Sequence, residues 1–158
     1  MTIEYPYKRI LVTGGCGFIG SSYIQNILRY YDDIEVQNID LMTYATSKKT
    51  LELLTEYKNF SHLTLDISKF LEIEGAINSF GPDLIVNFAA ESHVDNSIEG
   101  ALPFLSTNIL GVFNLLEISK NLISRNDKKF LFHQISTDEV FGDLDLEEPA
   151  FTEAHPYD

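Results

Sequence analysis

The sequence has few cysteines, few basic residues and no long apolar run. Its one cysteine, Cys16, cannot form an internal disulfide, which fits a reducing cytoplasm. Only 11 Lys and Arg stand against 24 Asp and Glu, a net charge of −13. Nucleic acids and anionic membranes bind clustered Lys and Arg, so neither is an expected partner. No apolar run approaches the roughly 18 residues of a membrane span, and residues 1–9 lack a signal-peptide core. We therefore expect a soluble, cytoplasmic protein.

What the sequence does contain is an alternation of short apolar runs with amphipathic stretches. The apolar runs are residues 9–13, 35–39, 61–65, 83–88 and 129–135. The helix-like stretches between them are residues 18–31, 48–57, 68–80 and 101–125. This alternation is typical of βαβ units, whose parallel sheet is covered by helices on both faces. We predict an α/β fold with an incomplete, doubly wound Rossmann-type sheet of these five strands. No repeat or linker divides the chain, so residues 1–158 should form one domain.

A glycine-rich loop, TGGCGFIG at residues 13–20, joins the first predicted strand to the first predicted helix. It fits G-x-G-x-x-G at Gly15, Gly17 and Gly20, and G-x-x-G-x-x-G if Gly14 replaces Gly15. Without Cβ atoms, such a loop turns tightly and lets a pyrophosphate contact the backbone at a helix N-terminus. The strand and helix around it provide the context that a dinucleotide fingerprint requires. The alternative is a glycine turn that binds nothing.

Carboxylates follow the second and third apolar runs. Asp40 lies about 20 residues past the glycine loop, where a carboxylate accepts hydrogen bonds from the adenosine ribose. It would repel a 2′-phosphate, so NAD is favoured over NADP; alternatively, Asp40 only caps the next loop. For Asp66 and Ile67 two interpretations carry equal weight. Both residues would lie along the adenine, or Asp66 would only be the N-cap of the next helix. We expect Cys16 to be a small filler facing the cofactor rather than a redox thiol.

The segment STDEVFG, residues 136–142, follows the last apolar run, which we expect to be a buried strand. It places Thr137, Asp138 and Glu139 at the carboxyl end of that strand, where α/β proteins bind ligands. Neighbouring carboxyls in a dry cleft tend to have divergent pKa values, so that one acts as an acid and the other as a base. The alternative is that the two carboxylates merely begin a surface loop.

Five segments together resemble a known family. They are TGGCGFIG (13–20), DLMTYA (40–45), AAESHVD (89–95), TN (107–108) and STDEVFG (136–142). In this order they resemble the extended short-chain dehydrogenase/reductases, specifically the nucleoside-diphosphate-glucose 4,6-dehydratases of the dTDP-glucose type. The similarity spans nearly the whole chain. Its most diagnostic part is Thr-Asp-Glu, because related sugar epimerases share the glycine loop but lack the acid pair.

The resemblance implies a lyase of nucleotide-sugar metabolism and deoxysugar biosynthesis that uses NAD in an intramolecular redox cycle. Hydride leaves C4 of the glucose, water is lost across C5 and C6, and the hydride returns to C6 to give a 4-keto-6-deoxy sugar. By this resemblance Thr137 would hydrogen-bond the C4 oxygen, Asp138 would protonate the departing hydroxyl, and Glu139 would remove the C5 proton. The substrate would be dTDP-glucose or UDP-glucose, a choice that the sequence leaves open.

The resemblance also implies binding residues. Those around NAD would be Gly14, Gly17, Phe18, Ile19, Gly20, Asp40, Leu41, Met42, Thr43, Asp66, Ile67, Phe88, Ala89, Ala90, Glu91 and Thr107. Ser92, His93 and Thr137 would contact the sugar, and no metal site is expected. The helix from Ala101 resembles one that packs against a second subunit, which implies a homodimer, although an ordinary core helix has the same apolar stripe.

The chain departs from the family pattern in several places. The family's catalytic Tyr-x-x-x-Lys pair should follow the Thr-Asp-Glu segment, but the sequence stops at Asp158. Tyr44 and Lys48 match the spacing at the adenosine end, where we reject them as catalytic. Smaller departures are Leu41, Asn96 and Phe141, where the family often has Lys, Arg and Tyr. We therefore expect an N-terminal, NAD-binding part that lacks the C-terminal sugar-nucleotide domain and has little turnover alone. The alternatives are a 4-epimerase or a non-catalytic NAD-binding fragment.

Overall fold

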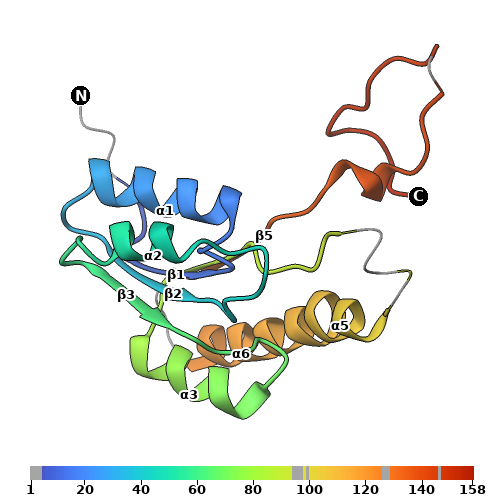
Figure 1. Ribbon diagram of the computed structural model, residues 1–158. Coiled ribbons are helices and arrows are strands. Elements are labelled where there is room, and N and C mark those ends of the chain that lie inside the picture. Colours follow the sequence, from blue (N-terminus) through green and yellow to red (C-terminus); the bar gives the residue numbers. More distant parts are fainter. Residues whose placement is uncertain (1–4, 94–97, 99, 126–128, 146) are drawn as a thin grey trace.

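The computed structural model describes residues 5–93, 98, 100–125, 129–145 and 147–158 (Figure 1). Five parallel strands form one sheet in the order β3-β2-β1-β4-β5. The strands are β1 (Arg9–Thr13), β2 (Glu35–Ile39), β3 (Phe60–Leu63), β4 (Leu84–Asn87) and β5 (Leu131–Gln134). The chain builds outward from β1 to β3 and then crosses to the other side of β1 for β4 and β5 (Figure 1). This is the predicted doubly wound α/β fold.

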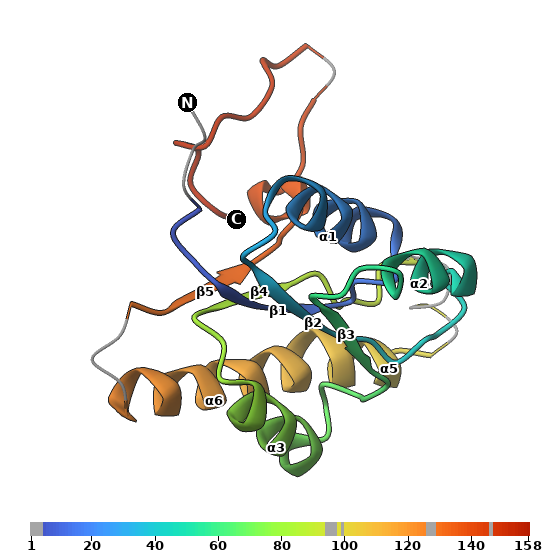
Figure 2. The ribbon, with the colours of Figure 1, turned by 90° about the vertical axis from the view of Figure 1, so that its left-hand side faces the viewer.

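Helices cover both faces of the sheet, as Figure 2 shows in a view along its edge. On one face lie α1 (Phe18–Tyr30) and α2 (Lys48–Leu54), which pack on alternate residues of β1, β2 and β4. On the other face lie α3 (Phe70–Phe80) and α6 (Val112–Arg125), which pack on the intervening residues. The central strands are buried from both sides, which explains why their sequences read as continuous apolar runs.

The predicted helix at residues 101–125 is three joined segments. They are α5 (Leu102–Phe104), a π-helix η1 (Leu105–Gly111) and α6. Leu102–Ser124 is long and apolar enough, by length and composition alone, to cross a membrane, and 28% of its most apolar window is buried. This corrects our expectation that no apolar stretch approaches that length, because the scattered Ser and Asn residues hide it in a scan for unbroken runs. One face carries the buried Leu115 and Ile118, whereas the opposite face is exposed.

The last strand differs from its prediction as a buried strand. β5 pairs only with β4 among the described residues, and most of its side chains are exposed, including Leu131 at 42%. Beyond β5, a short 3-10 helix η2 (Asp138–Phe141) leads into a segment that projects away from the sheet (red in Figure 1). That segment returns to donate a hydrogen bond from Asp158 N to Val140 O, 3.1 Å. The segment therefore contacts η2, but no residue of η2 is buried.

Candidate functional site

The loops at the carboxyl ends of β1, β2, β3 and β4 enclose a small cavity of about 110 Å³. Twelve of the predicted NAD residues line this cavity: Gly14, Gly17, Asp40, Leu41, Thr43, Asp66, Ile67, Phe88, Ala89, Ala90, Glu91 and Thr107. Ile39, Ala45, Thr46 and Leu65 also line it and were not predicted. Parallel strands bring their carboxyl ends to one edge of the sheet, which is why the segments after four strands meet there, and η1 adds Thr107.

The glycine loop packs too closely for side chains. Gly14 has a φ of +70°, and a Cβ there would lie 2.6 Å from the backbone nitrogen of Ala89. A Cβ on Gly20 would lie 2.5 Å from the carbonyl oxygen of Gly14. Gly17 lines the cavity and is the N-cap of α1, and because no side chain caps this helix its first-turn N–H groups have no side-chain acceptor. This arrangement suits an anion such as a pyrophosphate.

Four predicted NAD residues do not line the cavity. Phe18 and Ile19, in the first turn of α1, are 91% and 64% exposed. Gly20 lies behind the loop against Gly14 and Gly15. Met42 has a φ of +59°, unusual for a residue with a side chain, and its N–H donates to Asp40 Oδ1 at 2.8 Å. The contribution of Met42 is therefore a backbone turn at the end of β2.

Asp40 joins the two halves of the cavity wall. Its side chain is 6% exposed, and its Oδ2 accepts a hydrogen bond from Cys16 N at 2.8 Å. With the bond from Met42 N, Asp40 both caps the following loop and holds the glycine loop, while it still lines the cavity. Asp66 behaves similarly: it lines the cavity and its Oδ1 accepts from Ser68 N at 2.8 Å. In each case the binding and capping interpretations are compatible, because each carboxylate oxygen can accept more than one bond.

Cys16 is buried, and its thiol contacts the amide of Asn38 rather than lining the cavity. This corrects the expectation that it faces a cofactor. Burial and the charge of Asp40 raise the pKa of the Cys16 thiol to about 12, although a hydrogen bond from Asn38 acts in the opposite sense. The thiol therefore stays protonated at neutral pH, which argues against a redox role.

Three asparagines that the sequence reasoning did not single out as site residues position the walls. Asn38 on β2 accepts a hydrogen bond from Gly15 N at 2.9 Å. Asn87 on β4 bonds to Thr13 and donates to Gln134 Oε1 at 2.8 Å, which ties β1, β4 and β5 together. The sequence did carry a signal for both residues, since each is an asparagine near the carboxyl end of a mostly apolar run.

The third asparagine, Asn108, lies on the π-helix η1. Its Oδ1 accepts from Glu91 N and its Nδ2 donates to Glu91 O, both at 2.9 Å. This pair of bonds holds the segment after β4, while the adjacent Thr107 lines the cavity. The wider turn of a π-helix is often found at functional sites.

A second cavity of about 380 Å³ adjoins the first and shares Ala89, Ala90 and Glu91 with it. Its remaining wall is Ser92, Phe104, Asn108, Val112, Gln134, Ile135, Ser136, Thr137 and Glu139. Three predicted residues, Ser92, Thr137 and Glu139, therefore meet here. Thr137 Oγ1 donates to Glu139 Oε2 at 3.3 Å.

Asp138 and His93 lie elsewhere. Asp138 lines a neighbouring hollow of about 660 Å³ with Tyr157 and Asp158, so the two adjacent carboxylates face different spaces. The ring of His93 lies 5.6 Å from that of Tyr44, and neither residue lines the first cavity. Thr137, Asp138 and Glu139 are all exposed among the described residues, so the expected dry cleft is not formed by them. Val94, Asp95 and Asn96 lie outside the described residues.

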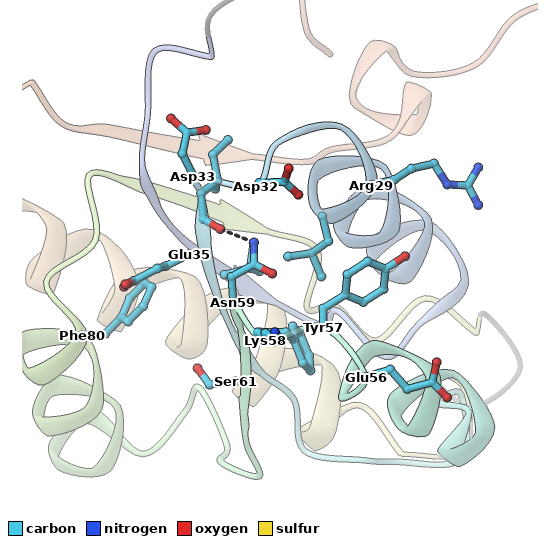
Figure 3. Close-up of a pocket in the computed structure, with 14 residues that line it drawn as sticks. Arg29, Asp32, Asp33, Glu35, Glu56, Tyr57, Lys58, Asn59, Ser61 and Phe80 are labelled. Carbon is cyan, nitrogen blue, oxygen red and sulfur yellow. Dashed lines mark hydrogen bonds between the residues drawn. The ribbon is translucent and has the colours of Figure 1, made fainter.

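A larger hollow, about 980 Å³, is at the opposite end of the sheet, around the start of β2 and β3 (Figure 3). Charged side chains of both signs surround it, and two of its acids pair outside it: Asp33 with Lys8, and Glu35 with Arg9. Because none of the predicted residues lies there, its size does not make it the candidate site. No group of metal ligands is found in the described ranges.

Comparison with known proteins gives three findings. A family model described as GDP-mannose 4,6 dehydratase matches residues 11–158. A dTDP-glucose 4,6-dehydratase of Haemophilus influenzae is 46% identical over 152 residues, which cover 94% of this chain and 45% of that protein. The chain thus spans less than half the length of the curated relatives it matches.

Two solved structures share the fold. One is a Streptomyces venezuelae dTDP-glucose 4,6-dehydratase with NAD and TYD bound, which is 36% identical with a TM-score of 0.81; the match covers 95% of this chain and 45% of that one. The other is a Campylobacter jejuni UDP-Glc/GlcNAc 4-epimerase, which is 26% identical with the same TM-score; the match covers 96% and 43%. The backbone alone therefore does not separate these two activities.

Proposed function

The chain belongs to the GDP-mannose 4,6 dehydratase family, and we propose that residues 1–158 are the NAD-binding part of a dTDP-glucose 4,6-dehydratase. One observation carries this proposal: two adjoining cavities share the wall 89–91. The first holds the glycine loop and Asp40, and the second holds Thr137 and Glu139. A dinucleotide that extends from the first cavity would present its reactive end at the second. The choice of dTDP-glucose follows the relatives' names, since the described residues include no base-recognition site that we can identify.

The residues that line the first cavity suit the adenosine ribose and pyrophosphate of NAD. The glycine loop leaves room where Cβ atoms would collide, and the N-terminus of α1 would face the pyrophosphate. Asp40 would accept hydrogen bonds from the adenosine ribose and disfavour a 2′-phosphate. NAD, when bound, supplies reversible hydride acceptance. The chain's own residues bind it, orient it and bring the sugar beside it.

In the second cavity, Thr137 would hydrogen-bond the C4 oxygen of the glucose and Glu139 would take the proton from C5. Asp138 would protonate the hydroxyl that leaves C6. The two carboxylates line different hollows, which supports separate roles because an acid and a base must approach different atoms of the sugar. Ser92 lines the same cavity and would contact the sugar. His93, beside Tyr44, is less directly placed for that contact.

A 4-epimerase is the second candidate, favoured by the equal fold similarity to the Campylobacter jejuni enzyme. A non-catalytic NAD-binding chain is the third. Formation of the 4-keto-6-deoxy sugar by a protein that continues this chain to the length of its relatives separates the first two. Asp138→Asn should abolish dehydration, whereas an epimerase would be unaffected. The 158-residue chain should bind NAD more tightly than NADP in calorimetry and form little 4-keto sugar; absence of NAD binding would contradict the proposal.

We also propose a homodimer in the cytoplasm. The outward face of the helix at residues 102–124 exposes Leu105, Ile109, Phe113 and Leu116 by 47–62%, in one stripe. Its opposite face packs on the sheet through Leu115, Ile118 and Leu122, so the helix is already anchored in a folded domain. A second copy would bury the stripe, which supports a dimer over a membrane span. Sedimentation should give a dimer, and Phe113→Glu a monomer that still binds NAD.

A further inference from the structure

Two polar side chains from neighbouring strands of the sheet lie next to each other, beside the glycine loop. Asn38 on β2 is paired in register with His62 on the neighbouring strand β3. The side chain of Asn38 is fully buried, and His62 is half-buried. A buried carboxamide must have its hydrogen bonds satisfied, so the partners of Asn38 define what this position does.

The hydrogen-bond roles follow from one backbone donor. Because Gly15 N–H donates to Asn38 Oδ1 at 2.9 Å, the other end of the amide is the NH₂ group. That group donates to Cys16 Sγ at 3.2 Å and faces His62 Nδ1 at 3.1 Å. An NH₂ group only donates, so His62 Nδ1 must accept and must carry no proton. The imidazole is then neutral with its proton on Nε2, which donates to Thr64 Oγ1 at 3.1 Å.

We propose that Asn38 and a neutral His62 act together as positioning residues that hold the glycine loop in its binding geometry. The inference rests on the proposed NAD site. Asn38 contacts Gly15 and Cys16, and Cys16 N–H in turn donates to Asp40. The carboxamide therefore sets the distance between the loop that would bind the pyrophosphate and the carboxylate that would bind the ribose. The contact is direct, because a Cβ on Gly15 would lie 2.4 Å from Asn38 Oδ1.

Protonation of His62 would break this arrangement. An N–H on Nδ1 would face the N–H of Asn38, and two donors cannot bond to each other. Burial lowers the pKa of His62 from its usual 6.5, while the negative charge of Asp40 acts in the opposite direction. The neutral ring therefore prevails at neutral pH. Its contribution is present above 6.5 and is lost as the pH falls through the lowered pKa of the folded protein.

Other ionisable groups near this face do not replace His62 in that role. On α2, the helix that packs over this side of the sheet, Lys48, Lys49 and Glu52 are exposed. The Cys16 thiol remains neutral because its pKa is raised to about 12. The negative charge of Asp40 acts on the His62 ring and favours its protonated form, so it opposes the effect of burial rather than replacing His62.

Calorimetry of NAD binding tests the proposal in the wild-type chain, His62→Asn and His62→Phe. Nuclear magnetic resonance first determines the pKa of His62, and binding is measured on both sides of that value. Asn at position 62 keeps an acceptor where Nδ1 lies but does not titrate, whereas Phe removes the acceptor. Wild-type affinity should fall roughly fivefold or more on acidification, as expected for a lost buried hydrogen bond. His62→Asn should keep the neutral-pH affinity with a flat profile, and His62→Phe should be weak at both pH values.

A flat wild-type profile, or an equal acid-induced loss in His62→Asn, would overturn the proposal. Resonance spectra give a readout that does not need NAD. The backbone amides of Gly15 and Cys16 should shift with the pKa of His62 in the wild type and should not shift in His62→Asn. If NAD binds at no pH, the proposed function fails, and these amide shifts still decide whether His62 positions the loop.

Discussion

The two ends of the cleft are built differently. At the adenosine end, Gly15, Cys16, Asn38 and Asp40 are buried and joined by hydrogen bonds of 2.8–3.2 Å. At the sugar end, Thr137, Asp138 and Glu139 are exposed on a short 3-10 helix after an edge strand. The first end lies over the central strands, where helices cover both faces, whereas the second lies over β5, which has one neighbouring strand among the described residues. Cofactor binding should therefore be a property of this chain, and catalysis should need further enclosure of the triplet.

The strongest test of this contrast is a side chain in the glycine loop. Gly14→Val should reduce NAD affinity at least about a hundredfold, because the positive φ is strained for any side chain and Cβ would strike Ala89. Calorimetry gives the affinity, and a thermal melt shows whether the domain stays folded. Gly75→Ala is the matched control: its Cβ meets nothing within 4 Å, and Ala favours the interior of α3 by about 1 kcal/mol. If Gly14→Val and Gly75→Ala had equal NAD affinities, the glycine loop would not be part of the NAD site.

A smaller loss is expected from Asp40→Ala. It removes the acceptor for Cys16 N and Met42 N as well as the proposed ribose contact. NAD affinity should fall about ten- to a hundredfold, as is usual for bonds to a charged acceptor. Asp32→Ala, at the far end of the sheet, is the control and should bind normally. If Asp40→Ala bound NAD as tightly as the wild type, the proposed ribose contact would be wrong and Asp40 would only cap the loop.

Asn108→Ala should have an intermediate effect that reaches both ends of the cleft. Its amide holds Glu91, which lines both cavities, but these bonds are exposed to solvent. We expect a roughly three- to tenfold loss of NAD affinity. Asn108→Asp keeps the acceptor for Glu91 N and should recover part of it. If alanine changes nothing, the wall at residues 89–91 is held by other contacts.

The smallest effect on binding should come from the sugar end. Asp138→Asn should change NAD affinity in the 158-residue chain less than about twofold, because Asp138 faces a hollow separate from the first cavity. In a protein of the relatives' length the same substitution should abolish dehydration. A large loss of NAD affinity in Asp138→Asn would mean that the two ends of the cleft are coupled, contrary to the contrast drawn above.

Much of the fold could be predicted because each element carries its own periodicity. The five apolar runs became five strands, and the helix boundaries agree within a few residues. The burial of the last run could not be predicted in this way, because an apolar strand in the centre of a sheet and one at its edge have similar sequences. The π-helical turn at Leu105–Gly111 was missed for a similar reason, since its apolar spacing resembles that of an α-helix.

The candidate site shows the same division. Gly14, Gly17 and Asp40 could be found because their spacing follows from local geometry: a turn, a helix start and a strand end. Asn108 was in a recognised motif, but its bond to Glu91 joins segments 17 residues apart. The sequence could not predict that the neighbouring residues Asp138 and Glu139 line different hollows, because this depends on the backbone of η2.

By itself, the sequence determined the strand and helix order, the glycine loop and the acid pair after the last strand. These features depend on the conformational preferences of short segments, which neighbouring residues largely set. Only the tertiary structure decided that Asn38 meets His62, that Cys16 points away from the cavity, and that the triplet is exposed. Those outcomes depend on strand register and on which surfaces are covered, and contacts between distant segments determine both.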